Sequence, residues 1–199
     1  MPKLKKADRT RGALLDAALR VIGRKGFAAA TVEEIVREAG VSKGVAYYHF
    51  KSKEQMAESI LDLEFSAVAD QFEEIAESEG SPSEVLLGML GAFSTRLYER
   101  HELAQLFATE IWRSGRAWSE GVRSAGQGLI DLIALQLTRG QDEGTVRSDL
   151  DPTFAAASIV GMVVADAVYC LGEEGPARLS REQFTERIHD FVHHAVALR

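Results

Sequence analysis

The stretch that most constrains how this chain folds runs from Thr31 to Lys53 and reads TVEEIVREAGVSKGVAYYHFKSK. Two short helical patterns meet inside it at Gly40, a residue type that tolerates the positive φ of a tight turn. The first pattern opens with a Thr-x-x-Glu capping box at Thr31 and Glu34, and the second follows Ser42, a favoured N-cap residue. Two short helices joined by a tight turn predict a helix-turn-helix.

The second of these helices carries side chains that suit a DNA groove. Lys43, Tyr47 and His49 supply charge, hydrogen-bonding groups and flat rings within two turns. Gly44 permits close approach to a sugar–phosphate backbone, and Val45 is suited to contact with a thymine methyl group. Tyrosine-rich helices also occur in protein interfaces, so the charge of the surroundings is needed to choose between the two partners.

Charge is divided unevenly along the chain. Residues 1–53 hold twelve Lys/Arg and five Asp/Glu, a net charge of +7, whereas the remainder holds eleven and twenty-five, a net charge of −14. Chance clustering of solvated charges is the alternative, but a basic head on an acidic body favours a head that binds DNA. Residues 1–10 are expected to form a mobile basic arm, either solvated or within reach of DNA.

Apolar residues at helical spacing continue through the rest of the chain, and no run alternates with period two for long. We therefore expect an all-α fold of about nine helices, with a three-helix head over residues 1–53 and a larger helical domain over residues 54–199. Beyond the head, the expected helices cover residues 53–77, 82–98, 101–113, 116–139 and 153–172, and a last helix begins at Ser180.

The motifs of the head are specific enough to indicate a family. Residues 26–53 combine a Gly-Phe entry, Thr-Val before the second helix, Ala-Gly-Val-Ser, Lys-Gly, Tyr-Tyr-His-Phe and a closing Lys-x-Lys. This pattern resembles the DNA-binding domain of the TetR family of transcriptional regulators. The resemblance covers roughly the first 55 residues, and the remainder is similar to the family only in its helical plan.

The resemblance assigns DNA contacts to particular residues. It implies contacts at or near base edges from five residues of the second helix: Lys43, Gly44, Val45, Tyr47 and His49. It implies phosphate contacts from Thr31, Ser42, Tyr48 and Lys53. Two alternatives stay open, because Tyr48 could largely pack and His49 could only cap the helix or bridge to a phosphate.

A single module of this size reads few base pairs, so helix-turn-helix proteins usually dimerise and place two recognition helices about 34 Å apart. We expect the partner to be double-stranded DNA with a palindromic operator. The resemblance implies a homodimer in which the last two long helices form a four-helix bundle. The helix over residues 153–172 suits this role because it contains small residues that allow close helix approach, namely Ala155, Ala156, Ala157, Gly161 and Ala165.

The larger domain also holds candidates for binding a small-molecule effector. Aromatic and sulfur-bearing residues gather there, and they are either core or the lining of a pocket for an apolar, partly aromatic ligand. These candidates are Met89, Phe93, Phe107, Trp112, Trp118, Met162 and Tyr169. Several polar groups lie within or beside apolar helices, where they either orient a ligand or are paired in the core: Arg96, His101, Glu110, Arg113 and Asp166.

Other chemistries find little support in the sequence. It lacks a Gly-x-Ser-x-Gly elbow, a P-loop and a His-Glu-x-x-His motif, and we expect neither an enzyme nor a bound cofactor. His189 and His193 have the i, i+4 spacing of zinc ligands, with His194 beside them. No third ligand converges nearby in the sequence, so a solvated helix face is favoured over a metal site.

The sequence also favours a cytoplasmic protein. Its start has no apolar segment behind the basic residues, and its one cysteine, Cys170, excludes an intrachain disulfide. The run from Phe154 to Gly172 contains one charged residue, Asp166, but it has no flanking basic residues. A buried helix therefore explains this run better than a membrane span.

These observations predict a one-component, ligand-responsive transcriptional regulator, most simply a homodimeric repressor that an apolar or aromatic effector releases from its operator. A transcriptional activator or a regulator controlled by a partner protein is the alternative within the same fold. A helical ligand carrier or enzyme that merely contains the head is the alternative from another class.

Overall fold

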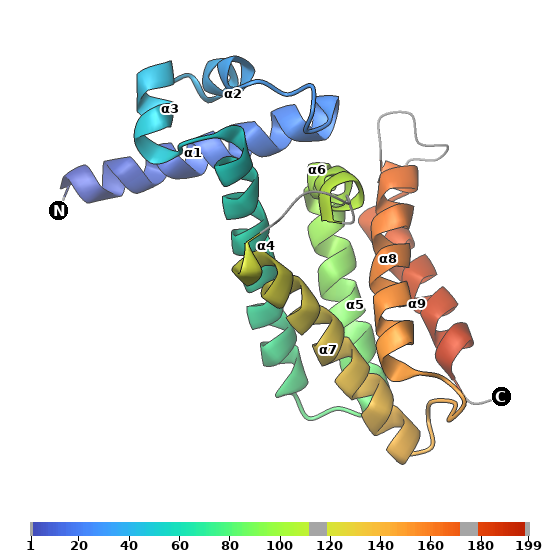
Figure 1. Cartoon of the computed structure of the whole chain (residues 1–199). Helices are drawn as coiled ribbons and strands as arrows, with labels where there is room; N and C mark the ends of the chain where they lie inside the picture. The colour runs from blue at the N-terminus through green and yellow to red at the C-terminus, as the bar shows by residue number, and fades with distance from the viewer. Residues whose placement is uncertain (1, 112–118, 172–178, 198–199) are drawn as a thin grey trace.

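The computed structural model describes residues 2–111, 119–171 and 179–197, and Figure 1 shows their arrangement. Within these residues the chain forms nine α-helices and one isolated bridge, between Val146 and Ala197. The helices are α1 (Pro2–Lys25), α2 (Val32–Ala39), α3 (Lys43–His49), α4 (Lys53–Ala76), α5 (Pro82–Glu99), α6 (His101–Leu106), α7 (Glu120–Asp142), α8 (Pro152–Leu171) and α9 (Arg181–Val196). A π-helical turn, η1 (Phe107–Ile111), follows α6. The predicted all-α fold is confirmed.

Helix starts follow the capping signals in the sequence. Thr31, Ser81 and Ser180 each accept a hydrogen bond from the backbone three residues on and complete a capping box, and Pro82 occupies the first turn of α5. Helix α4 lacks the full capping box: its N-cap Ser52 accepts from the backbone of Gln55 at 3.3 Å, but the Gln55 side chain accepts from the backbone of Lys51 at 2.6 Å instead of from Ser52.

The N-terminus corrects another expectation. The sequence predicts a mobile arm for residues 1–10, but α1 begins at Pro2 and continues without a break to Lys25. The physical reason lies in composition: proline is tolerated in the first helical turn, and the Lys, Leu, Ala and Arg residues that follow are good helix formers.

The head, α1 to α3, lies across one end of an elongated body made of α4 to α9 (Figure 1). Helix α1 packs against α2 within the head and against both α4 and α6 of the body. In the body, α7 packs against α4, α5 and α8, and α9 packs against α5. One continuous apolar core runs through both parts, so the head is anchored to the body along α4 and α6.

Helix α8 is long and apolar enough to cross a bilayer by length and composition, a test that core helices also pass. In this fold one side of it packs against α5, α6 and α7. Its buried residues follow helical spacing: Ala155, Ala156, Ile159, Val163, Val164 and Ala167.

Candidate DNA interface and ligand cavity

Helix α3 is held by its buried face and exposes the other. Ala46 and Phe50 are buried against the head, and Ser42 caps the helix by accepting a hydrogen bond from the backbone of Val45 at 3.3 Å. Gly40 ends α2 with a φ of 66°, which is the left-handed conformation that its turn requires. The helix-turn-helix therefore forms as its sequence predicts.

The exposed face of α3 carries most of the residues predicted to contact bases. Tyr47 is 49% exposed, and Lys43 and Val45 stand beside it on the surface. The ammonium group of Lys43 lies 5.8 Å from the centre of the Tyr47 ring. A Cβ built at Gly44 would meet nothing closer than Ser42 Oγ at 3.9 Å, so protein packing does not demand glycine there.

Lys43 also forms an ion pair with Glu33 of α2. This hydrogen bond lowers the pKa of the Glu33 carboxyl and raises the pKa of the Lys43 ammonium group. Both groups are exposed, so the pair is weak and readily exchanged. If a DNA phosphate displaced Glu33, Lys43 would pair with that phosphate at the N-terminal end of α3.

Tyr48 and His49 lie at the C-terminal end of α3. Tyr48 is 82% exposed, which argues against the alternative that its ring mainly packs. Its ring meets the half-buried ring of His49 edge-on, with centroids 5.1 Å apart. Their DNA contacts stay predictions.

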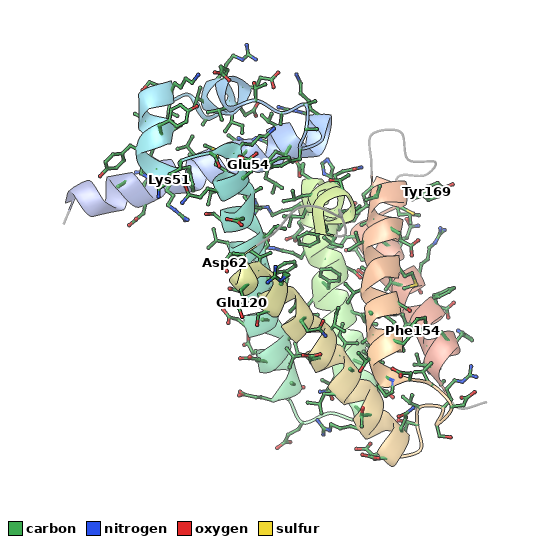
Figure 2. All side chains as sticks on the ribbon, in the orientation of Figure 1. Lys51, Glu54, Asp62, Glu120, Phe154 and Tyr169 are labelled. Atoms are coloured by element: carbon green, nitrogen blue, oxygen red, sulfur yellow. The ribbon has the colours of Figure 1, made fainter. Side chains whose placement is uncertain are left out.

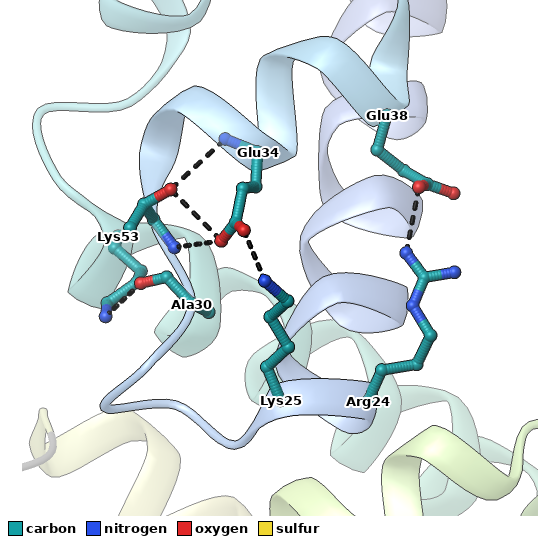
Figure 3. A network of polar contacts seen from close by, with 7 residues as sticks. Arg24, Lys25, Ala30, Glu34, Glu38 and Lys53 are labelled. Carbon is teal, nitrogen blue, oxygen red and sulfur yellow. Dashed lines mark hydrogen bonds and ion pairs between the residues drawn. The ribbon is translucent and has the colours of Figure 1, made fainter.

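Thr31 and Lys53 are already bonded inside the head, and Figure 3 shows the bond from Lys53 to Ala30. The Thr31 hydroxyl donates to Glu34 at 3.1 Å and accepts from the Glu34 backbone at 3.3 Å. The Lys53 ammonium group donates to the carbonyl oxygens of Phe27 and Ala30 at 2.5 and 2.6 Å. Both residues thus fix the entry to α2, and a phosphate contact would add to that role.

A cavity of about 250 Å³ lies in the body between α4, α5, η1, α7 and α8. The rings of Phe65 and Phe107 stack in its wall with centroids 5.3 Å apart. Arg123 and Gln127 of α7 supply its polar lining. The rest of the wall is formed by Phe93, Val122, Gly126, Leu129, Ile130, Val160 and Val164.

The cavity includes two of the seven residues predicted to bind an effector, Phe93 and Phe107. Met89 is fully buried in the core, and Met162 is half-buried on α8; neither lines the cavity. Tyr169 is 66% exposed on the outside of the body (Figure 2). Trp112 and Trp118 lie outside the described residues.

Sequence reasoning missed Phe65 and most of the α7 wall. A signal was present at Gly126, because a glycine inside a helical pattern often marks a site of close approach. A Cβ built at Gly126 would lie 3.5 Å from the Phe65 ring, at the cavity wall.

Comparisons with known proteins agree with this arrangement. Residues 14–60, which span α2, α3 and parts of α1 and α4, match the family described as bacterial regulatory proteins, tetR family. The chain is 30% identical over 142 residues to the HTH-type transcriptional repressor KstR2 of Mycolicibacterium smegmatis, covering 71% of this chain and 69% of KstR2. The chain belongs to the TetR family.

Two further comparisons include the body. The A-factor receptor protein of Streptomyces griseus is 34% identical over 179 residues, which cover 90% of this chain but 61% of that receptor. The structure of AibR in complex with isovaleryl coenzyme A and operator DNA superposes with a TM-score of 0.75 at 20% identity, covering 92% of this chain and 97% of AibR. At this identity the likeness establishes the fold.

His189, His193 and His194, the candidates for a metal site, lie on α9. His189 is half-buried against α5, where burial lowers the pKa of its ring and a hydrogen bond with the backbone of Leu87 partly offsets this. His193 and His194 are exposed. Among the described residues no three potential ligands converge to hold a metal ion.

Proposed function

We propose that this TetR-family regulator is a homodimeric repressor that leaves its operator when a small apolar or aromatic effector occupies the body cavity. The observation that carries the proposal is the presence, in one chain, of an exposed basic–aromatic helix α3 and an apolar cavity lined in large part by α7. Two of its relatives are named as a repressor and as a receptor, which supports the same proposal.

The proposed dimer uses the outer faces of α8 and α9. Phe154 is 76% exposed on α8 and Phe191 is 63% exposed on α9, although exposed aromatic patches are uncommon on monomers. A Cβ built at Gly161 would meet nothing within 4 Å, which leaves room for a second helix. A dimer also supplies the second recognition helix that an inverted-repeat operator needs.

The cavity limits the size of the effector. Its volume of about 250 Å³ lies at the small end of ligand-binding cavities, which typically measure about 300–1,000 Å³. The apolar wall suits a short branched chain or a single ring, and Arg123 adds positive charge at the α7 side. We propose an effector with a compact apolar group and a polar or anionic end. In a short-chain acyl-coenzyme A, the acyl group would occupy the cavity and the coenzyme A portion would extend outside it.

The proposed switch requires the effector to bind the two conformations of the dimer unequally. A coupling free energy of about 3 kcal/mol would weaken operator binding roughly a hundredfold. Because both binding events are linked, operator DNA would weaken effector binding by the same factor.

The test is a titration of the protein–operator complex, with the operator first selected from random-sequence DNA. Isovaleryl-coenzyme A and stearoyl-coenzyme A are added in parallel, with coenzyme A alone as the control. We expect the short acyl-coenzyme A to release the DNA at lower concentration than the long one. An operator complex that resists every acyl-coenzyme A excludes this effector class, and mass spectrometry of co-purified small molecules then becomes the route to the effector.

A further inference from the structure

We infer that Arg100 is a positioning residue that ties the orientation of the DNA-binding head to the wall of the body cavity. The inference rests on the proposed function, because it explains how an occupied cavity alters the head. Arg100 lies between α5 and α6, and its guanidinium group holds one carboxylate from the body and one from the head.

The body side of this link is buried. Glu64 of α4 is 4% exposed, and its two oxygens are held separately: Arg96 donates to Oε2 through Nε at 2.7 Å, and Arg100 donates to Oε1 through Nη1 at 2.6 Å. Two cations therefore offset the cost of burying one carboxylate. Because each oxygen has its own arginine, a shift of α4 along α5 strains these bonds.

The head side of the link reaches α1. The other terminal nitrogen of Arg100, Nη2, donates to Oδ1 of Asp16 at 2.9 Å. Asp16 is exposed, and an isolated surface pair of this kind contributes little. Here, however, the bond to buried Glu64 already fixes the guanidinium group, so Asp16 gains a partner at a defined position.

Helix α1 also touches α6 closely near this link. A Cβ built at Gly23 would lie 2.5 Å from Cβ and 3.0 Å from Cα of Glu102, two residues after Arg100. The head thus meets the body at a polar link through Arg100 and at a tight contact between two helices.

Both parts of this junction continue directly into the cavity wall. Glu64 precedes Phe65, and α6 runs into η1, which begins at Phe107. These two aromatic rings are the stacked pair of the cavity. A group that separates or tilts them would push α4 and α6 apart, and Arg100 would transmit that movement to α1 through Asp16.

A change inside the chain tests this without any effector. Gly126 faces the Phe65 ring, so Gly126→Phe places an aromatic group in the cavity, whereas Gly126→Ala adds a Cβ at ordinary contact distance. We expect Gly126→Phe to bind the selected operator about tenfold more weakly than Gly126→Ala. In an Asp16→Asn background, the ratio of operator affinities between Gly126→Ala and Gly126→Phe should fall below about threefold.

Asp62→Asn is the matched control, because Asp62 is an exposed carboxylate on α4 and its loss changes the net charge equally (Figure 2). The ratio should stay near tenfold in that background. An equal ratio in the parent, Asp16→Asn and Asp62→Asn backgrounds overturns the inference, and so does an unchanged affinity of Gly126→Phe in the parent.

Arg100→Met provides a second test, with Glu64 still paired to Arg96. It should also reduce the ratio of operator affinities between Gly126→Ala and Gly126→Phe. If Arg100→Met lowers thermal stability but leaves this ratio at tenfold, Arg100 has only a structural role and the inference is overturned. The acyl-coenzyme A titration tests the proposed effector class independently of Arg100. Its failure would exclude the effector class, while the Gly126 comparison would still decide the role of Arg100.

Discussion

Aromatic side chains are exposed on two faces of this molecule, and the charges around them differ. On α3, Tyr47 and Tyr48 stand with Lys43 in a head whose sequence is basic. On the outer side of the body, Phe154 and Tyr169 belong to α8, whose charge comes from Asp166 alone (Figure 2). Burial raises the pKa of the Asp166 carboxyl, as expected for an acid in apolar surroundings.

The comparison shows why exposed aromatic area does not by itself identify a partner. Rings beside cations suit a polyanion, because phosphates supply the affinity and base edges the specificity. Rings beside small apolar residues suit another apolar helix face. The two faces therefore predict different partners, and variants can separate them.

The largest effect is expected on the body face. The double substitution Phe154→Glu with Phe191→Glu places charge in the proposed dimer interface, while both positions are exposed and should still fold. We expect monomers by light scattering and operator affinity lower by more than about a hundredfold, because both half-sites can no longer be held together.

Leu63→Glu is the control for that experiment, since Leu63 is a half-exposed apolar residue on α4. It should leave the dimer intact. A double variant that still forms dimers would exclude α8 and α9 as the interface.

The next effect is expected on the head face. Tyr47→Ala should weaken specific operator binding by about tenfold or more, in line with the ~1–3 kcal/mol of a good base contact, and affect binding to random DNA less. His49→Ala should act in the same direction. Fluorescence anisotropy with operator and random duplexes measures both, and Tyr47→Phe separates the hydroxyl from the ring. If both alanine variants bind like the parent, the contact assignment is wrong.

An intermediate effect is expected where the head meets the body. Gly23→Ala would drive a Cβ into Glu102, so we expect a loss of about 1–3 kcal/mol in the free energy of unfolding. Gly12→Ala lies on the same helix with nothing within 4 Å of the added Cβ, and it should be neutral or stabilise by up to ~1 kcal/mol. Urea unfolding compares the two, and equal stabilities would contradict the close α1–α6 contact.

The smallest effect is expected from Glu33→Gln. This change releases Lys43 from its ion pair and removes a negative charge beside the DNA face. We expect operator binding about two- to threefold tighter at low salt, with the gain fading as salt screens the charges. Glu54→Gln, an exposed change of the same charge on α4, serves as the comparison. Weaker binding by Glu33→Gln would mean that the pair positions Lys43 for DNA.

The head could be predicted in detail because its signals are local. The capping box at Thr31, the turn at Gly40 and the cap at Ser42 each involve residues within a few positions of one another. The face of α3 then follows from helical periodicity. Even here, the bonds of Lys53 to the carbonyls of Phe27 and Ala30 join distant positions and were missed.

The body could be predicted only as a set of helices. The sequence around Glu64 gives no sign that this charge is buried. It is buried because it pairs with Arg96 and Arg100, which lie 32 and 36 residues further along the chain. Helix α8 is apolar nearly all round, so periodicity could not tell that Tyr169 faces outward while Val164 lines the cavity. Which faces meet is decided by packing between helices that are remote in sequence.

The most direct test is selection of binding sites from a random DNA pool by the purified protein, followed by titration of the selected site at several salt concentrations. We predict an inverted repeat whose half-sites are centred about 10 base pairs or a multiple of that apart, bound with an affinity that falls steeply as salt rises. Failure to enrich any sequence over random DNA would contradict the regulator function, and enrichment of a lone half-site would contradict the dimer.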